Sequence, residues 1–289
     1  MRKKVLMMML GLLVAIGGMA AEIDWILVKK SDAKLQKEKF AVEYDFKIMK
    51  FEVTVDRYCE FLNAVAKMDT LGLFDKRMRI ARTGSPVKFV YKPKDGYAKH
   101  PVSFINFFRA ARFANWLHNG KPSGRGGKGL TEDGAYDMKG DLETHSKDAK
   151  FWIPTEKEWC KVAYYDPEKS VKNEKPFYWD FGDKTLYSKS RYPKFEAPPG
   201  GAHSANCSKA LKETTPVGAY TSAVSAYGLF DINGNVFEWT ETNRGKGGKN
   251  IRGSAWNHSG SYMLISTRTG ARLKEVAAGY GFRLAAKAK

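Results

Sequence analysis

Cysteine is scarce in this chain. Only Cys59, Cys160 and Cys207 occur among its 289 residues, and no two of them form a CxxC pair. An odd number of cysteines cannot complete a disulfide framework. A fold that depends on several disulfides is therefore excluded, although a single disulfide is allowed. Cys59 and Cys160 fall in helical patterns beside apolar neighbours, where a buried thiol behaves as a small hydrophobic side chain.

Several motifs that define common enzyme classes are also missing. The sequence contains no HExxH and no GxSxG, and its Gly-rich segment 120–129 lacks the GxxxxGK[ST] order of a phosphate-binding loop. The five histidines are scattered, with no pair at the helical spacing that metal ligands use. The patterns typical of zincin proteases, α/β-hydrolases and P-loop proteins are thus absent.

Long apolar runs are confined to the N-terminus. A basic start (Arg2-Lys3-Lys4), an apolar stretch (residues 5–16) and a small-residue cleavage site (residues 18–21) are typical of a signal peptide. The apolar stretch is too short for a comfortable membrane span, and no cysteine follows it as a lipoprotein anchor would require. We expect residues 1–21 to be removed and the mature protein to be exported to the periplasm, cell surface or medium, with no stable membrane span left. Retention as an N-terminal anchor is the alternative.

Acidic residues are few beside basic ones, with 31 against 49, and the formal net charge is +18. Three basic residues lie in the predicted signal peptide, so 46 remain against 31 acidic residues, a charge of +15. Such an excess favours anionic partners such as acidic polysaccharide, lipid headgroups or nucleic acid. Export and the lack of a basic run interleaved with aromatic residues argue against nucleic acid. A generally basic, solvated surface is the simpler interpretation.

Hydrophobic periodicity predicts a single α+β domain over residues 22–289, because no linker or repeat interrupts it. Expected helices follow Thr54 to about residue 67, Ser103 to about residue 118, and the capping box at Thr155 to about residue 165. Segments 69–99 and 166–201 show no clear period and are expected to be irregular. Expected strands cover residues 23–28, 41–53, 236–239, 251–256 and 280–284, the last two forming a pair.

The segment Gly228–Thr240 concentrates oxygen ligands, turn residues and large aromatic residues. Asp231 and Glu238 supply carboxylates, and Gly234 permits an unusual backbone conformation. Carboxylates and carbonyls at such spacing suit a hard cation such as calcium. An EF-hand is excluded, because Val236 stands where that loop needs glycine and the twelfth position is not glutamate.

This segment resembles the Gly-Asn-aromatic-Glu-Trp signature of the formylglycine-generating enzyme (sulfatase-modifying factor) family. Further family motifs follow in order between about Tyr44 and Leu284. They are Glu52-Val-Thr54, His100-Pro-Val-Ser103, Asn115-Trp-Leu117, Trp152-Ile-Pro-Thr-Glu-Lys-Glu-Trp159, Pro216-Val-Gly218, Arg252-Gly-Ser254 and Gly281-Phe-Arg-Leu284. The resemblance implies that family's variant of the C-type lectin fold.

The resemblance also implies calcium sites. One would use the side chains of Asp231 and Glu238 and the carbonyls of Gly234 and Val236. A second would use Asn206 and the carbonyl of Cys207, although the loop that should complete it looks shortened. A hydrogen-bonded turn without metal is the alternative, and any calcium here would be structural.

The chemistry of the family is not expected here. Its founding reaction oxidises a sulfatase cysteine to formylglycine with copper held by two cysteines, because soft sulfur selects monovalent copper. The matching positions after Ser254 are Asn257 and about Tyr262, and no cysteine follows Cys207. A second branch of the family makes sulfur–histidine bonds with iron held by a histidine cluster on an added helical domain, for which this chain has no room. We therefore expect no catalytic residues and no copper.

The favoured function is an exported, non-catalytic module that binds a glycan or a protein and is stabilised by calcium. Its ligand-binding face is predicted to contain Ser254, Trp256, Asn257, His258, Tyr262, Arg268 and Arg272. Stacking and anion contacts by such side chains suit an anionic glycan or an envelope protein. Packing of Trp256 and Tyr262 into the core is an equal alternative. An oxidoreductase of the formylglycine-generating type and a structural component of a cell-surface assembly are the alternative functions.

Overall fold

The computed structural model describes residues 22–31, 39–140, 142, 144–187, 199–201 and 203–288. The predicted signal peptide lies outside these ranges. The helices are α1 (Val55–Val65), α2 (Phe107–His118), α3 (Glu156–Tyr164), α4 (Pro167–Lys172) and the 3₁₀ turn η2 (Gly260–Met263). Within the described ranges, no helix combines the length and the apolar character that a membrane crossing needs.

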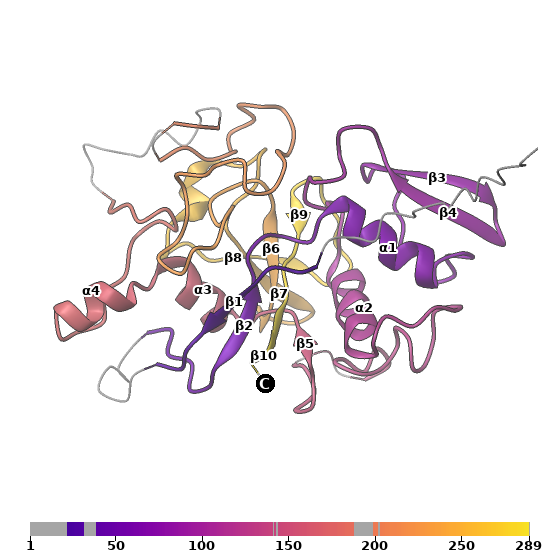
Figure 1. Cartoon of the computed structure of the whole chain (residues 1–289), viewed down its shortest axis with the longest axis horizontal. Coiled ribbons are helices and arrows are strands. Elements are labelled where there is room, and N and C mark those ends of the chain that lie inside the picture. The colour runs from indigo at the N-terminus through magenta and orange to yellow at the C-terminus, as the bar shows by residue number, and fades with distance from the viewer. Residues whose placement is uncertain are drawn as a thin grey trace, which may run out of the picture.

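The strands form two four-stranded sheets and a separate hairpin. They are β1 (Trp25–Val28), β2 (Phe46–Met49), β3 (Ile80–Ser85), β4 (Lys88–Pro93), β5 (Phe151–Trp152), β6 (Phe237–Asn243), β7 (Gly248–Arg252), β8 (Thr269–Arg272), β9 (Tyr280–Gly281) and β10 (Ala285–Lys287). The first sheet has the order β1-β2-β10-β5 and the second β8-β7-β6-β9. Figure 1 shows β10, close to the C-terminus, beside strands from the start of the chain.

This mixture of short strands, few helices and long connections is the predicted α+β architecture. One continuous cluster of buried apolar residues draws members from both sheets and from α1, α2 and α3. Aromatic rings dominate it where α1 meets α2, for example Phe61 against Phe113 at 5.4 Å between ring centroids. Such edge-to-face pairs add to the stabilisation that burial supplies.

Two of the three predicted helices begin where the sequence indicates. Thr54 precedes α1, and the predicted capping box opens α3, where the Thr155 side chain accepts from the Glu158 amide and the Glu158 side chain accepts from the Thr155 amide. The prediction for α2 was wrong at its start. Phe104 adopts a φ of 60°, which interrupts a helix, and Asn106 is the N-cap, accepting from the Arg109 amide.

Three further predictions are corrected. Residues 80–93 of the expected irregular segment form the β3–β4 hairpin, whose outward polar side chains hide its period. Asp166 caps the short helix α4 inside the second irregular segment, of which residues 188–198 are not described. The predicted pair of final strands does not exist, because β6 lies between β7 and β9 and pairs with both.

Candidate functional site

A tight turn after β7 carries most of the predicted ligand-binding residues. Ser254 at its start is fully buried with a φ of 71°, and its hydroxyl donates to the Ser259 carbonyl at 3.0 Å. The Trp256 amide donates to the Asn235 carbonyl, which ties the turn to the segment before β6. Ser254 therefore stabilises the turn from its buried side, and its hydroxyl is not exposed to a ligand.

The turn places an aromatic cluster at the start of β6. The Phe237 ring contacts those of His258 at 4.9 Å, Tyr262 at 5.5 Å and Tyr280 at 6.2 Å between centroids. Phe237 is buried, whereas Tyr262 is 36% exposed and His258 is partly exposed. Trp256 is also partly exposed and donates from its indole nitrogen to the Ala278 carbonyl. Tyr262 and His258 thus pack on the core with one side and face solvent with the other.

Asn257 and His258 form the polar part of this turn. Asn257 Oδ1 lies 2.9 Å from His258 Nδ1, so the proton belongs on Nδ1 and Nε2 is left as an acceptor. Burial, helped by the nearby Lys209 charge, lowers the pKa of His258, and the ring is neutral at pH 7. Gly279 lies directly behind, where a Cβ would be 2.8 Å from Asn257 Oδ1. The pair can exchange hydrogen bonds with a neutral polar ligand.

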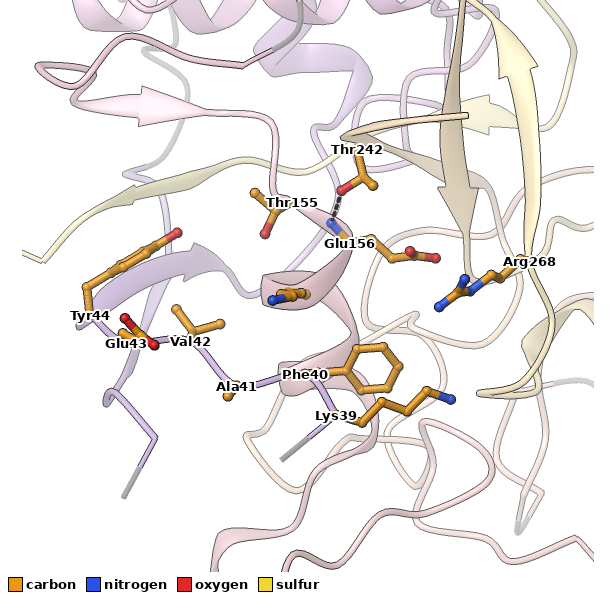
Figure 2. Close-up of a pocket in the computed structure, with 11 residues that line it drawn as sticks. Lys39, Phe40, Ala41, Val42, Glu43, Tyr44, Thr155, Glu156, Thr242 and Arg268 are labelled. Carbon is orange, nitrogen blue, oxygen red and sulfur yellow. Dashed lines mark hydrogen bonds between the residues drawn. The ribbon is translucent and has the colours of Figure 1, made fainter. Parts of the chain in front are cut away.

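The two predicted arginines do not join this cluster. Arg268 precedes β8 and Arg272 ends it, and both are exposed. Arg268 lines a separate pocket of about 600 Å³ together with residues 39–44, the start of α3 and Thr242 (Figure 2). None of the turn residues from Ser254 to Tyr262 lines that pocket.

Glu238, a predicted calcium ligand, is engaged in a buried ion pair. Arg283 donates to both of its oxygens, at 2.7 and 2.8 Å, and the indole of Trp159 donates to Oε2 at 2.9 Å. Glu238 and Arg283 are both fully buried. Glu238 does not fit the role of a metal ligand in this arrangement, because a cation there would have to displace both donors.

The other predicted calcium ligands are arranged differently. Asp231 is buried; its Oδ2 accepts from the Gly218 amide at 2.6 Å, its Oδ1 receives no N–H donor, and the buried Glu52 carboxyl lies within hydrogen-bonding reach of the Asp231 side chain. The Asn206 side-chain oxygen is likewise buried without one, and the Cys207 carbonyl accepts from the Ala210 amide. Gly234 and Val236, whose carbonyls were predicted as ligands, are buried. In the part of the chain that the structure describes, no three His, Cys, Asp or Glu side chains are grouped as a metal site would need. Calcium at these positions stays a prediction.

All three thiols are buried, and none of them forms a disulfide. Burial raises the pKa of Cys59 to about 12 and that of Cys160 to about 11, although Arg252 lies 2.8 Å from the Cys160 sulfur. A protonated, enclosed thiol is a poor nucleophile and a poor copper ligand. Neither cysteine lies in the turn after Ser254.

The fold and the turn define an α+β domain of the C-type-lectin-like, formylglycine-generating-enzyme type. The profile of the sulfatase-modifying factor enzyme 1-like domain matches residues 12–288, and the chain belongs to this family. The crystal structure of CarF superposes with a TM-score of 0.55 and 20% identity, over 93% of this chain and 99% of CarF. PvdO from Pseudomonas aeruginosa gives a TM-score of 0.47 and 17% identity over 92% of each chain.

One curated protein shares sequence with the chain over a shorter stretch. Hercynine oxygenase from Mycolicibacterium smegmatis is 32% identical over 90 residues. These residues are 31% of this chain and 17% of that protein, so the match spans a small part of its length.

Two features escaped the sequence reasoning. The first is the ion pair between Glu238 and Arg283. Both residues lie in motifs noted in the sequence, but the pair could not be predicted because the spacing of distant motifs does not show which of them come into contact. The pocket beside Arg268 was also missed, since segment 39–44 looks like an ordinary strand start.

Proposed function

We propose that the chain is an exported, non-catalytic ligand-binding module built on the sulfatase-modifying-factor fold. The observation that carries the proposal is the turn after Ser254. Where the family's reactive cysteines would stand, Asn257 and Tyr262 form part of a partly exposed aromatic and polar cluster. The burial of all three thiols supports the same conclusion.

The cluster suits a glycan or a protein loop as ligand. Tyr262 offers a ring face for stacking on a sugar or an apolar side chain, and His258 and Asn257 offer hydrogen bonds beside it. The basic charge of the chain favours an anionic partner at the cell envelope. Calcium, as proposed for Asp231 and its neighbours, would act on stability and not on chemistry.

A glycan array with the mature protein tests this proposal, run with calcium and with chelator. We expect saturable binding to a defined glycan, weakened about tenfold by Tyr262→Ala, which corresponds to about 1.4 kcal/mol. The matched control is Tyr187→Ala, which truncates another exposed tyrosine outside the turn and should bind the glycan as tightly as the wild type. The proposal would be contradicted if the folded protein bound no glycan on the array and also co-purified with no envelope protein in stoichiometric amount.

The enzymatic alternative has its own measurement. The mature protein is incubated with a Cys-x-Pro-x-Arg peptide, and mass spectrometry follows aldehyde formation over time with and without copper. We expect no aldehyde. Aldehyde that forms with time and only with copper would overturn the proposed binding function. The protein would then be an oxidoreductase that works without a cysteine at position 257.

A further inference from the structure

The pocket beside Arg268 has the lining of a second, different ligand site. It is formed by segment 39–44, the first turn of α3, Thr242 at the end of β6, and Arg268 before β8. Its volume of about 600 Å³ is in the range that small-molecule sites occupy. These elements are far apart in the sequence, and the Glu156 amide donating to the Thr242 hydroxyl at 2.9 Å joins two of them (Figure 2).

Three cationic side chains line the pocket without ion-pair partners. Lys39, Lys157 and Arg268 are all exposed, and within the described ranges no carboxylate lies within 4.0 Å of any of their charged nitrogens. Lys39 extends past the Phe40 ring, 5.3 Å from its centroid. Figure 2 shows Lys39 and Arg268 reaching the same end of the pocket. Two free cations there form a site for one anionic group, and arginine can hold a carboxylate through two parallel hydrogen bonds.

Carboxylates and hydroxyls line the same pocket. The Glu156 side chain is 10% exposed and points toward Arg268, yet no ion pair joins the two. Its Oε2 accepts from Nδ2 of the Asn250 side chain at 3.1 Å, and its buried Oε1 has no hydrogen-bond partner, with Arg252 Nε at 3.7 Å. Glu43 is exposed at the opposite end, near Tyr44. Glu156 thus has Arg252 as its ion-pair partner, which leaves Arg268 available to a ligand.

This combination selects the chemistry of the ligand. A dense polyanion such as a polyphosphate or polyglutamate would be repelled by Glu43 and Glu156. A neutral sugar would leave the cations unused. A sugar unit with one carboxylate and several hydroxyls satisfies both sets, because the carboxylate pairs with Arg268 and Lys39 while hydroxyls donate to the glutamates and exchange hydrogen bonds with Thr242.

We propose that this pocket binds a hexuronate unit of an acidic polysaccharide. The proposal rests on the binding function proposed above and assigns its acidic ligand to the pocket of Arg268, Lys39 and Glu156, separate from the Tyr262 cluster. The carboxylate lies between Arg268 and Lys39, and the ring hydroxyls lie toward Glu43 and Tyr44.

Titration calorimetry with the mature protein and defined oligosaccharides tests the proposal. The probes are oligogalacturonate, a neutral glucan of the same length, and polyglutamate. Oligogalacturonate is expected to bind with one site per protein, while the two others bind at least tenfold more weakly. Arg268→Gln and Lys39→Gln should each weaken oligogalacturonate about tenfold. Arg125→Gln and Lys88→Gln remove the same charges from exposed positions outside the pocket and should leave the affinity unchanged.

A second variant tests the selectivity. Glu43→Gln, at an exposed position where folding is not at risk, should narrow the preference for oligogalacturonate over polyglutamate by raising the affinity for polyglutamate severalfold. If oligogalacturonate binds equally to the Arg268 variant and its control but is lost in Tyr262→Ala, the pocket proposal is overturned and the binding module stands. If the wild-type protein binds no saccharide at all, both the pocket assignment and the glycan form of the proposed function fail.

Discussion

At the scale of single residues, the buried charges of Arg283 and Glu238 determine how the second sheet joins the first. Arg283 lies between β9 and β10, and its guanidinium also donates to the carbonyls of Met49, Lys50 and Phe230. Removing one partner of such a pair leaves the other charged and desolvated. We expect Glu238→Gln to lower the free energy of unfolding by about 3–5 kcal/mol, measured by urea denaturation.

The matched control breaks an ion pair in water. Lys29 is 72% exposed and pairs with Asp45 at 2.9 Å, so Lys29→Gln should change stability little, because solvent screens exposed pairs. A Glu238→Gln variant as stable as Lys29→Gln would show that the Arg283 pair is not closed in solution.

Gly234 is a second residue on which the signature segment depends. Its φ is 88°, and a Cβ there would lie 2.3 Å from the Asn206 carbonyl oxygen. Gly234→Ala should therefore cost roughly 3 kcal/mol or more, through strain plus a forced backbone shift. Gly245 has a φ of 62°, and a Cβ added there would have no neighbour within 4 Å. Gly245→Ala should therefore lower the free energy of unfolding by only about 1–2 kcal/mol, from backbone strain alone. Equal losses of thermal stability in the two variants would contradict this account.

At the scale of elements, His145 fastens the loop before β5 to strand β6. Its Nδ1 lies 2.9 Å from both Glu241 oxygens, its ring stacks on Trp152 at 4.6 Å, and Glu241 also accepts from the hydroxyl of Tyr136. Burial alone would lower the pKa of His145, but the hydrogen bond and charge of Glu241 outweigh it and raise that pKa. The ion pair therefore stabilises the fold fully below the unfolded pKa of about 6.5 and is lost as the pH rises through the folded value.

We expect His145→Gln to destabilise the protein most at pH 6 and progressively less toward high pH, measured as the difference in unfolding free energy from the wild type. His118→Gln is the control with the opposite sign, because burial and the Lys150 charge lower the pKa of His118. Its stabilising effect is lost as the pH falls. Parallel profiles for the two variants would disprove the assignment.

Local signals explain which elements could be predicted. The capping box of α3 at Thr155 and the apolar period of α1 each depend on residues that are close together in the sequence. The starts of both helices were therefore predicted correctly. The β3–β4 hairpin was missed because Ile80 and Tyr91 are nearly its only buried side chains. The start of α2 depends on the positive φ of Phe104, which no local pattern indicates.

The candidate site shows the same limit. Family motifs pointed to Tyr262 and His258, which do lie together around Phe237. They also pointed to Arg268, which belongs to a pocket shared with Lys39 and Thr242. Segments more than a hundred residues apart meet there, and a single sequence carries no record of such contacts.

At the scale of the whole molecule, the net charge, +18 for the full chain and +15 without residues 1–21, adds a long-range attraction for acidic ligands to any local contact. The two contributions respond differently to salt, because the screening length falls from about 10 Å at 0.1 M to about 3 Å at 1 M. We expect the affinity for oligogalacturonate to fall about tenfold or more between 50 and 500 mM NaCl, with most of the loss in the association rate.

Arg268→Gln should lower the affinity at both salt concentrations, chiefly through faster dissociation, because a direct contact with the carboxylate is only partly screened. The control Arg125→Gln should alter only the small share that general charge contributes at low salt. Surface plasmon resonance resolves the two rates, and an Arg268→Gln defect that vanishes at 500 mM NaCl would show that Arg268 acts as one charge among many and not as part of a built site.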